Sequence, residues 1–514
     1  MASILQYRKI ATLEAVESFS PSIVELQPYG ETLDNHEVLL VDAKSNELAL
    51  NPRSWRLYQR ILYTVLVTLV GAIVSWAGSI TSAAAKAASE EFGVSETVES
   101  LATGLYFIGF GLGSLVAGPF SETFGRNITY TVTISLFICS VTGSALAPNI
   151  KTQLVFRFLA GFFGNTPLTC AGGSLADLWS PEERGTVVPL YAVGVFDGSV
   201  LAPIVGGWIA QGASSGVMSW RWVEWITIIL SAFFLLLIVI FLPETYAPVL
   251  VQWKTHHIRV RTRDRRHRAP IEVTKEPLLK RLERAMHRPF ALLIRELIIF
   301  TIALYLILVY VVFFTFLNGF PFIFGETHQW GPGLTGTAFL SILIGQHLPL
   351  FLIPVTRKWA TMYTAKREAS GAQEVDPSEN RLWMAMVGAV ALPISLFWLG
   401  WTAYPNISPW PGLAGGVLFG FACVAIYTSF YMYVIGVYAA YAASGLASTT
   451  VLRYVVAGAM VPPSIPMYAQ LGNQWTLTLF GTLSIVMGTL PFVFFRYGLA
   501  LRNRSPFAKQ TATT

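Results

Sequence analysis

The sequence has little charge for its length. Asp, Glu, Lys and Arg make up 12 % of its 514 residues, while hydrophobic residues make up 54 %. A soluble chain usually carries roughly 25 % charged residues, so this scarcity excludes an ordinary water-soluble protein. Cysteine is also rare: Cys139, Cys170 and Cys423 all fall inside apolar runs. They lack the spacing of a metal site or a disulfide framework.

Common catalytic patterns are missing as well. The chain has no Gly-Lys-Ser/Thr loop for nucleotide phosphates, and its apolar runs hold no His-Glu-x-x-His motif and no Ser/His/Asp arrangement. We therefore expect neither an enzyme nor an ATP-driven pump, and no cofactor or metal. The net charge of +6 lies mainly in one segment between apolar runs rather than on a foldable basic domain. Nucleic acid is therefore not an expected partner.

Long apolar runs are abundant instead. They are near 20 residues in length, which is enough to cross a bilayer as a helix. Six precede a polar gap and six follow it, at 61–81, 98–119, 128–147, 153–175, 186–210, 222–242, 293–318, 334–355, 382–402, 411–435, 446–469 and 475–496. The pattern predicts an all-α integral membrane protein with twelve transmembrane helices in two six-helix bundles.

This count divides the chain into five parts. We expect a cytoplasmic, largely disordered N-terminal tail without a signal peptide, a six-helix bundle, a basic cytoplasmic linker loop, a second six-helix bundle and a cytoplasmic C-terminal tail. The respective ranges are 1–60, 61–242, 243–292, 293–496 and 497–514.

The distribution of basic residues predicts the orientation. Nineteen Lys and Arg residues lie in the loops on one side of the spans and three in the loops on the other. Because cytoplasmic loops retain positive charge, both termini should face the cytoplasm. The linker loop contributes twelve of the nineteen and is expected to be solvated near anionic headgroups.

The loop between spans 2 and 3 has a distinctive pattern. It contains Gly118, Ser121, Glu122, Gly125 and Arg126. Glycine ends span 2, and Arg126 can pair with a carboxylate or with the carbonyls at a helix end. We interpret this loop as a latch that stabilises one closed state of the protein.

Here the sequence resembles the major facilitator superfamily, whose signature in this loop is G-x-x-[SAD]-[DE]-x-x-G-R. The resemblance covers roughly residues 51–505 and narrows to the fungal twelve-span drug:proton antiporters. It also rests on Asn51-Pro-x-x-Trp55, Arg157-x-x-x-Gly161, Gly172-Gly173-Ser-x-Ala-Asp177, Arg184-Gly185, Pro203-x-x-Gly206-Gly207, Trp220-Arg221-Trp222, Pro243-Glu244-Thr245-Tyr246 and Arg453. The chain departs from these antiporters at Ser199, Ala202 and Gly436, which puts a shared coupling mechanism and substrate in doubt.

Three charged residues join the latch or the coupling candidates. Asp177 and Arg184 bracket the turn between spans 4 and 5, where they can complete the latch with Arg126. Arg157 lies within span 4, and an intramembrane charge is by default a functional hypothesis. The resemblance links this position with proton transfer, and the alternative is a structural Arg bonded to helix carbonyls.

Span 5 holds a second proton candidate and a hinge. Asp197 is near mid-bilayer, where a carboxylate is costly when charged, so it is a candidate for binding and releasing a proton; the alternative is a polar residue bonded across the bundle. Gly198, Pro203, Gly206 and Gly207 make one face small and kinkable. The resemblance implies the hinge of an antiporter, with ordinary small-residue packing as the alternative.

The second half supplies candidates for binding the substrate. Phe316, Asn318, Gln346 and His347 combine aromatic and polar groups in or near spans 7 and 8, as expected for an amphipathic organic molecule. Their alternative is ordinary packing and hydrogen bonding between helices. Arg453 in span 11 is either a binding or coupling residue or an anchor to carbonyls or headgroups.

These observations predict a secondary active transporter that exports small organic compounds in exchange for protons. The alternatives are an importer or a polyamine or metabolite exchanger on the same fold, and a non-transporting membrane sensor. We expect a monomer in the lipid bilayer of the plasma membrane, with the vacuolar membrane as the alternative. Its partners would be a small-molecule substrate and protons.

Overall fold

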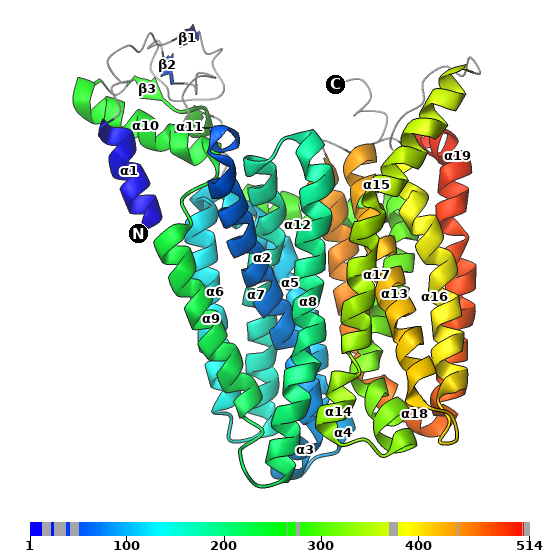
Figure 1. Ribbon diagram of the computed structural model, residues 1–514. Helices are drawn as coiled ribbons and strands as arrows, with labels where there is room; N and C mark the ends of the chain where they lie inside the picture. The colour runs from blue at the N-terminus through cyan, green and yellow to red at the C-terminus, as the bar shows by residue number, and fades with distance from the viewer. Residues whose placement is uncertain are drawn as a thin grey trace.

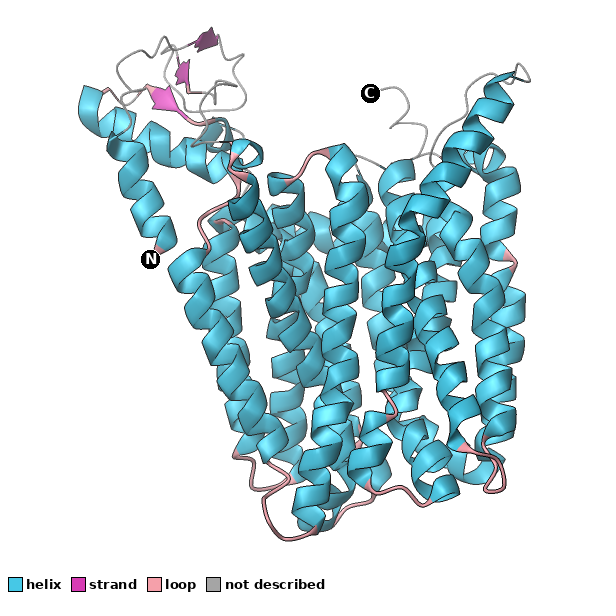
Figure 2. Ribbon diagram, in the orientation of Figure 1, coloured by secondary structure: helices cyan, strands magenta, loops and turns pink. Residues whose placement is uncertain are grey.

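The computed structural model describes residues 1–12, 22–24, 38–41, 51–264, 266–273, 278–369, 379–438, 441–505 and 507. Both predicted tails fall partly outside these residues. Long helices stand side by side in two groups (Figure 1), and helix dominates nearly the whole molecule (Figure 2). In a bilayer, only such internally bonded segments satisfy the backbone without water, so the apolar runs form helices.

The first half runs from residue 57 to residue 241. Its elements are α2 (Leu57–Ser79), η3 (Ile80–Ala84), α3 (Ala85–Phe92), α4 (Glu96–Glu99), α5 (Leu101–Phe124), α6 (Arg126–Ala145), α7 (Ile150–Leu178), α8 (Pro181–Ser214) and α9 (Trp222–Phe241). Local signals fix the helix starts: the Asn149 side chain accepts from Thr152 N–H at the start of α7, and Ser180 and Glu183 form a capping box at the start of α8.

The second half runs from residue 297 to residue 504. Its elements are α13 (Leu297–Phe320), the π-helix η4 (Pro321–Glu326), α14 (Pro332–Thr337), α15 (Leu340–Ala369), η5 (Glu379–Leu382), α16 (Trp383–Thr402), α17 (Pro409–Tyr438), α18 (Ala442–Gly488) and α19 (Leu490–Arg504). Gly472 breaks α18 with a φ of 78°. The two parts of this long helix are therefore separate spans.

The tail and the linker add small elements at one end of the bundle, which we call the linker end (upper in Figure 1). They are α1 (Ala2–Thr12), β1 (Ser22–Val24), β2 (Val38–Leu40), η2 (Pro52–Ser54), α10 (Ala247–Thr262), β3 (His267–Arg268), α11 (Pro270–Val273) and α12 (Leu278–Arg295). β2 pairs antiparallel with β1 and parallel with β3. The amphipathic α12 packs against α5 and α18, so it lies where the halves meet.

Ten helical segments among the described residues are long and apolar enough to cross a membrane. One of them, Ala442–Arg504, contains the break at Gly472 and counts as two spans. α7 is not among the ten but packs within the first half against α5 and α6. The result is twelve spans, which confirms the predicted fold class.

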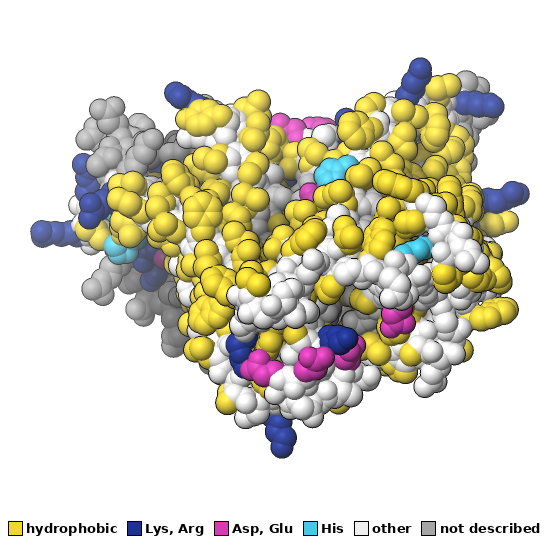
Figure 3. Space-filling model, turned by 60° about the horizontal axis from the view of Figure 1, so that its bottom comes forward, with side chains coloured by type: hydrophobic (Ala, Val, Ile, Leu, Met, Phe, Trp, Pro, Cys, Tyr) yellow, Lys and Arg dark blue, Asp and Glu magenta, His cyan; other side chains and the backbone are white. Residues whose placement is uncertain are grey.

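The surface agrees with a position in lipid. Figure 3 turns the end opposite the linker end forward and shows hydrophobic side chains over much of the surface, with one group of acidic and basic side chains low in the view and further charged side chains toward its edges. Large apolar residues such as Ile229, Phe233 and Leu236 are exposed on α9. Such a surface is costly in water but stable in a bilayer.

The two halves meet where α5 packs against α18 and where α8 packs against α14 and α15. Small residues allow this approach: a Cβ atom on Gly104 would lie 2.6 Å from the carbonyl oxygen of Gly458, and one on Gly207 would lie 2.5 Å from that of Pro332. The Phe107 and Phe314 rings stack across the interface with centroids 3.8 Å apart. This interface places a pocket at the middle of the molecule.

Candidate transport site

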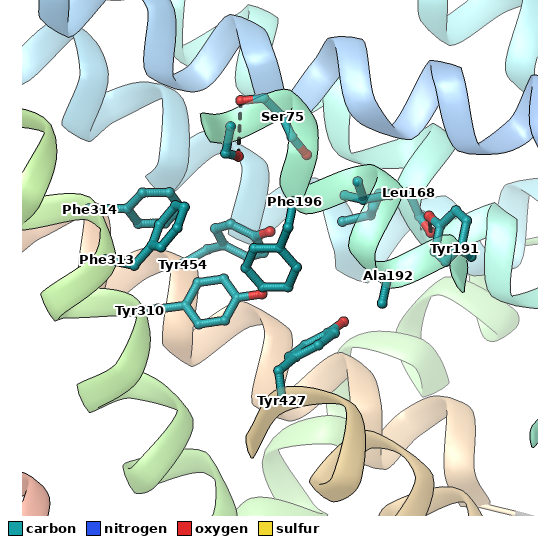
Figure 4. A pocket seen from close by; sticks show the side chains of 12 residues that line it. Ser75, Leu168, Tyr191, Ala192, Phe196, Tyr310, Phe313, Phe314, Tyr427 and Tyr454 are labelled. Carbon is teal, nitrogen blue, oxygen red and sulfur yellow. Dashed lines mark hydrogen bonds between the residues drawn. The ribbon is translucent and has the colours of Figure 1, made fainter. Parts of the chain in front are cut away.

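The pocket lies between the halves, near the middle of the long helices. Figure 4 shows aromatic side chains from both halves pointing into it. In this conformation its cavity volume is only about 20 Å³, room for roughly one water molecule. A substrate would therefore enter only when the halves separate. The lining residues are Ser75, Leu168, Tyr191, Ala192, Val195, Phe196, Ser199, Tyr310, Phe313, Phe314, Tyr427 and Tyr454.

Arg453 lies beside three of these residues. Its guanidinium carbon is 4.7 Å from the ring centroid of Tyr310, 5.0 Å from that of Tyr427 and 5.2 Å from that of Tyr454. The side chain is buried, with 3 % of its surface exposed. Cation–π contacts contribute about 0.5–2 kcal/mol each, whereas burying a charge costs several kcal/mol. The structure thus places Arg453 beside the tyrosines that line the pocket.

A second polar group joins the halves. Gln346 on α15 donates from Nε2 to Oδ1 of Asp197 on α8, and Nε2 of His347 lies 3.5 Å from Oδ2 of the same carboxylate. The sequence assigned Asp197 to proton coupling and the other two to substrate binding. The structure brings the three together in one contact between the halves.

The hydrogen bond of His347 to Leu343 determines which ring nitrogen carries a hydrogen. Its Nδ1 lies 2.8 Å from the carbonyl oxygen of Leu343, which can only accept, so Nδ1 carries a hydrogen. In a neutral imidazole, Nε2 then has none. A hydrogen bond from Nε2 to Asp197 therefore requires an additional proton, on either the imidazole or the carboxyl group.

The other two candidates from the second half lie away from the pocket lining. Asn318 donates from Nδ2 to the Val461 carbonyl at 3.0 Å and to Ser464 Oγ at 3.1 Å, which ties α13 to α18. The Phe316 ring packs against Phe419, with centroids 4.7 Å apart. Both side chains are buried within the second half. Their contacts fit the alternative to substrate binding, namely ordinary packing and hydrogen bonding between helices.

A buried polar cluster surrounds Arg157 within the first half. Its Nη1 lies 3.7 Å from Oε1 of Glu224, and its Nη2 donates to the Ala77 carbonyl at 2.8 Å and to Thr81 Oγ1 at 2.9 Å. Arg157 is fully buried and Glu224 is 1 % exposed. Both interpretations of Arg157 thus fit parts of this geometry, because it bonds a carbonyl and also faces an acid.

Glu99 extends this cluster, and neither Glu99 nor Glu224 was among the site residues predicted from the sequence. Gln153 donates from Nε2 to Oε1 of Glu99 at 3.2 Å, while Oε2 of Glu99 has no hydrogen-bond partner among the described residues. Glu99 and Glu224 lie in the first three residues of the predicted spans 98–119 and 222–242, so each has the position of an ordinary boundary residue. The sequence signal that could have found these two acids is an acidic residue at the second or third position of an apolar run.

The predicted latch forms a cluster of bonds at the linker end of the first half. Arg126 donates from Nε to Oδ2 of Asp177 at 3.2 Å and from Nη1 to Ser121 Oγ at 2.6 Å. Arg184 instead donates to the carbonyls of Trp179 and Ala176, so it caps the end of α7 and lies outside the Arg126 contacts.

Glu244, and not the predicted Glu122, is the acid that bonds the backbone at Arg126. Its Oε1 accepts from the Arg126 N–H at 2.9 Å and its Oε2 from the Asn127 N–H at 3.1 Å. Glu122 is exposed to solvent. Gly125 has a φ of 93°, and a Cβ atom there would lie 2.5 Å from Oε2 of Glu244, so the motif needs glycine at this position. At Gly118 a Cβ atom would meet nothing within 4 Å.

The predicted hinge lies in α8, which is continuous from Pro181 to Ser214 with Pro203 inside it. Gly198 and Gly206 pack against α2 and η3 of the same half, where Cβ atoms would lie 2.0 Å from the Ala72 carbonyl oxygen and 2.9 Å from that of Ile80. Gly207 faces α14 of the other half. The small face therefore serves packing in this conformation, and bending at α8 stays a prediction.

Two pseudo-equivalent halves of six spans around a mid-membrane pocket define a polytopic secondary transporter. The chain belongs to the Major Facilitator Superfamily, whose family model matches residues 67–462. This agrees with the expected resemblance and with a protein that is a transporter, not an enzyme.

Several fungal relatives are similar over most of their length. The chain is 44 % identical to the MFS-type transporter kojT of Aspergillus flavus, over 92 % of this chain and 84 % of that protein. It is 34 % identical to the citrinin biosynthesis cluster MFS transporter mrr1 of Monascus ruber, over 94 % of this chain and 95 % of that protein. It is 32 % identical to the efflux pump bik6 of Gibberella fujikuroi, over 91 % of this chain and 95 % of that protein.

Solved structures share the fold at low sequence identity. The xylose transporter XylE from E. coli, in a partially occluded inward-open conformation, superimposes with a TM-score of 0.59 at 15 % identity, over 85 % of this chain and 99 % of that one. The human organic anion transporter MFSD10 gives a TM-score of 0.58 at 16 % identity, over 85 % and 100 %.

Proposed function

We propose that the protein exports small organic compounds from the cytoplasm in exchange for protons. The mid-membrane pocket is mostly apolar and aromatic, as expected for organic ligands. Relatives named as an efflux pump and as transporters of biosynthesis clusters favour export. The plasma membrane is the proposed location, with the vacuolar membrane as the alternative, and we propose a monomer.

The observation that carries the proposal is the contact of Asp197 with Gln346 and His347. It joins α8 of one half to α15 of the other and holds an additional proton when His347 bonds Asp197. If α8 and α15 separate, water replaces the partners of Asp197, and the carboxyl group can release that proton. Proton binding and the closing of the halves are then linked, as coupled exchange requires.

The buried polar cluster is a second place where a proton can bind. Arg157 and Glu224 neutralise each other, whereas Glu99 has only an amide partner at Oε1. A buried carboxylate without a cation is costly, so Glu99 would be neutral. This cluster lies within the first half, and its protonation is therefore less directly linked to the movement of the halves than that of Asp197.

The alternative functions make different demands on the pocket. A polyamine exchanger would need carboxylates for a polycation, yet none of the twelve lining residues is acidic and Arg453 lies beside them. This disfavours polycations. An importer would use the same site, and its direction has to be measured. A non-transporting sensor is disfavoured by relatives that are named as transporters and pumps.

The test is an efflux assay in yeast cells that lack their own major exporters. Cells with and without the protein are loaded with a panel of fluorescent or radiolabelled organic compounds, and retention is followed with and without a protonophore. We expect faster loss of some compounds with the protein, and the protonophore should abolish the difference. Faster accumulation instead of loss would replace export with import, and efflux that resists the protonophore would remove proton coupling.

A further inference from the structure

Arg453 differs from the other buried arginines in the described part of the chain. Three arginines are buried there: Arg126, Arg157 and Arg453. Arg126 pairs with Asp177 and Arg157 with Glu224. None of the ion pairs formed by the described residues involves Arg453, and its Nε has no hydrogen-bond partner among them. Its positive charge thus lacks the negative partner that a buried cation requires.

The surroundings of Arg453 are suited to a flat ligand. Tyr310, Tyr427 and Tyr454 face its guanidinium and also line the pocket between the halves. Figure 4 shows these three rings gathered on one side of the pocket, each ending in a hydroxyl group. A phenol hydroxyl can donate to an oxyanion, and a tyrosine ring can stack on an aromatic body.

The first half covers this tyrosine group in the closed conformation. Phe196 on α8 lies 5.3 Å from Tyr427 and 5.9 Å from Tyr310, and Phe110 on α5 lies 4.8 Å from Tyr454, measured between ring centroids. These phenylalanines belong to the opposite half. Separation of the halves would therefore withdraw them and give a ligand access to the tyrosines and to Arg453.

We propose that Arg453, with Tyr310, Tyr427 and Tyr454, binds the carboxylate of the transported compound, so that the substrates are organic anions with a flat aromatic body. This inference takes the central pocket as the substrate site and thus rests on the transport function proposed above. The guanidinium supplies the charge, the hydroxyls orient the carboxylate, and the phenylalanines of the first half close over the aromatic body.

Equilibrium binding to the purified full chain in lipid nanodiscs tests the proposal. The probes are three pairs, and each pair consists of an aromatic acid and its neutral amide, which have similar shapes but different charges. The pairs are benzoate and benzamide, 2-hydroxybenzoate and its amide, and 2-naphthoate and its amide. At pH 7 the acids are ionised and the amides are not. We expect at least one acid to bind about tenfold more tightly than its amide, as for a charge-assisted bond.

Variants assign this preference to the site. Arg453→Gln should lower the affinity for the acid about tenfold and leave the amide nearly unchanged. Tyr427→Phe keeps the ring and should lower the affinity for the acid by a smaller factor. This variant also tests the proposal if Arg453→Gln yields no folded protein. A wild-type protein that binds no acid more tightly than its amide overturns the proposal, as does an Arg453→Gln protein that retains the preference.

The binding assay separates this inference from the transport function. It uses no proton gradient and no direction of movement. Charge-selective binding that depends on Arg453 would stand even if the efflux assay showed import or no effect of a protonophore. Conversely, protonophore-sensitive efflux of neutral compounds would leave the export function intact and remove the anionic substrate class.

Discussion

The guanidinium of Arg126 occupies the space beside Gly173. A Cβ atom on Gly173 would lie 2.2 Å from Nη2 and 2.4 Å from Cζ of Arg126. The glycine of α7 and the arginine that begins α6 therefore pack as one steric unit, although they lie 47 positions apart in the sequence. In the sequence Gly173 is recognisable only as part of a motif, and the structure shows that it makes room for Arg126.

Gly173→Ala should displace Arg126 and weaken its bonds with Asp177 and Ser121. We expect transport to fall about tenfold, equivalent to about 1.4 kcal/mol, with the fold retained because alanine favours a helix. Gly172→Ala is the matched control, since its Cβ atom would meet only Tyr431 Oη, at 3.5 Å. Efflux is measured at equal surface abundance. Equal effects of the two substitutions would remove Arg126 from the explanation.

Glu244→Gln should destabilise the linker end of the first half. The carboxylate accepts from the backbone N–H groups of Arg126, Asn127, Thr245 and Tyr246, and an amide NH₂ cannot accept at one of the two positions. Unsatisfied buried donors cost about 1–3 kcal/mol, so the melting temperature in detergent should fall. Glu122→Gln is the control at an exposed carboxylate. A larger fall in melting temperature with Glu122→Gln than with Glu244→Gln would support the sequence-based prediction that Glu122 is the acid of the latch.

Asp197→Asn should separate proton coupling from substrate movement. The amide keeps the shape and can still meet Gln346 and His347, but it cannot take up and release a proton. In proteoliposomes with an imposed pH gradient, we expect uphill accumulation to be lost and counterflow of substrate to survive. Gln346→Leu removes the hydrogen bond but leaves the carboxyl group, so it should retain accumulation. If Asp197→Asn still concentrates substrate, the coupling site lies elsewhere, with Glu99 next to be tested.

Arg157→Gln and Glu224→Gln should each reduce the amount of folded protein. Removing one partner of a buried ion pair leaves an uncompensated charge and costs about 3–5 kcal/mol. The double variant removes both charges and should be more stable than either single variant. Fluorescence-detected size exclusion and melting temperatures measure this. Additive losses in the double variant would show that the two side chains are energetically independent.

The sequence was sufficient for the twelve-span architecture because the length of an apolar run is a local property. Twelve spans follow from apolar runs that must satisfy their own backbone. The sequence also placed Ser121 and Arg126 of the loop motif in one group with Asp177 at the end of span 4, and the structure shows these contacts. Glu122 was placed in the same group because it lies next to Ser121 in the motif, but its side chain points to solvent.

The site depended on contacts between helices that spacing cannot reveal. Asp197 and Gln346 lie 149 positions apart, and no local pattern relates span 5 to span 8. Arg453 was recognised as an intramembrane charge, but the tyrosines beside it belong to three different helices. Asn318 and Phe316 were sensible polar and aromatic candidates, yet their faces of α13 turn into the second half.

The low apolarity of α7 has a consequence for how the protein is made. α7 carries the buried Gln153, Arg157 and Asn165, and among the described residues it is long enough to span a membrane but is not among the segments apolar enough to do so. Charged residues at the centre of a helix disfavour release from the translocon into lipid. We therefore expect α7 to enter the bilayer together with its neighbours, because Gln153 bonds Glu99 of α4 and Arg157 bonds the Ala77 carbonyl of α2 and Thr81 of η3. Biogenesis of the first half would then be a cooperative insertion of several helices, and a substitution on a neighbouring helix could prevent α7 from inserting at all.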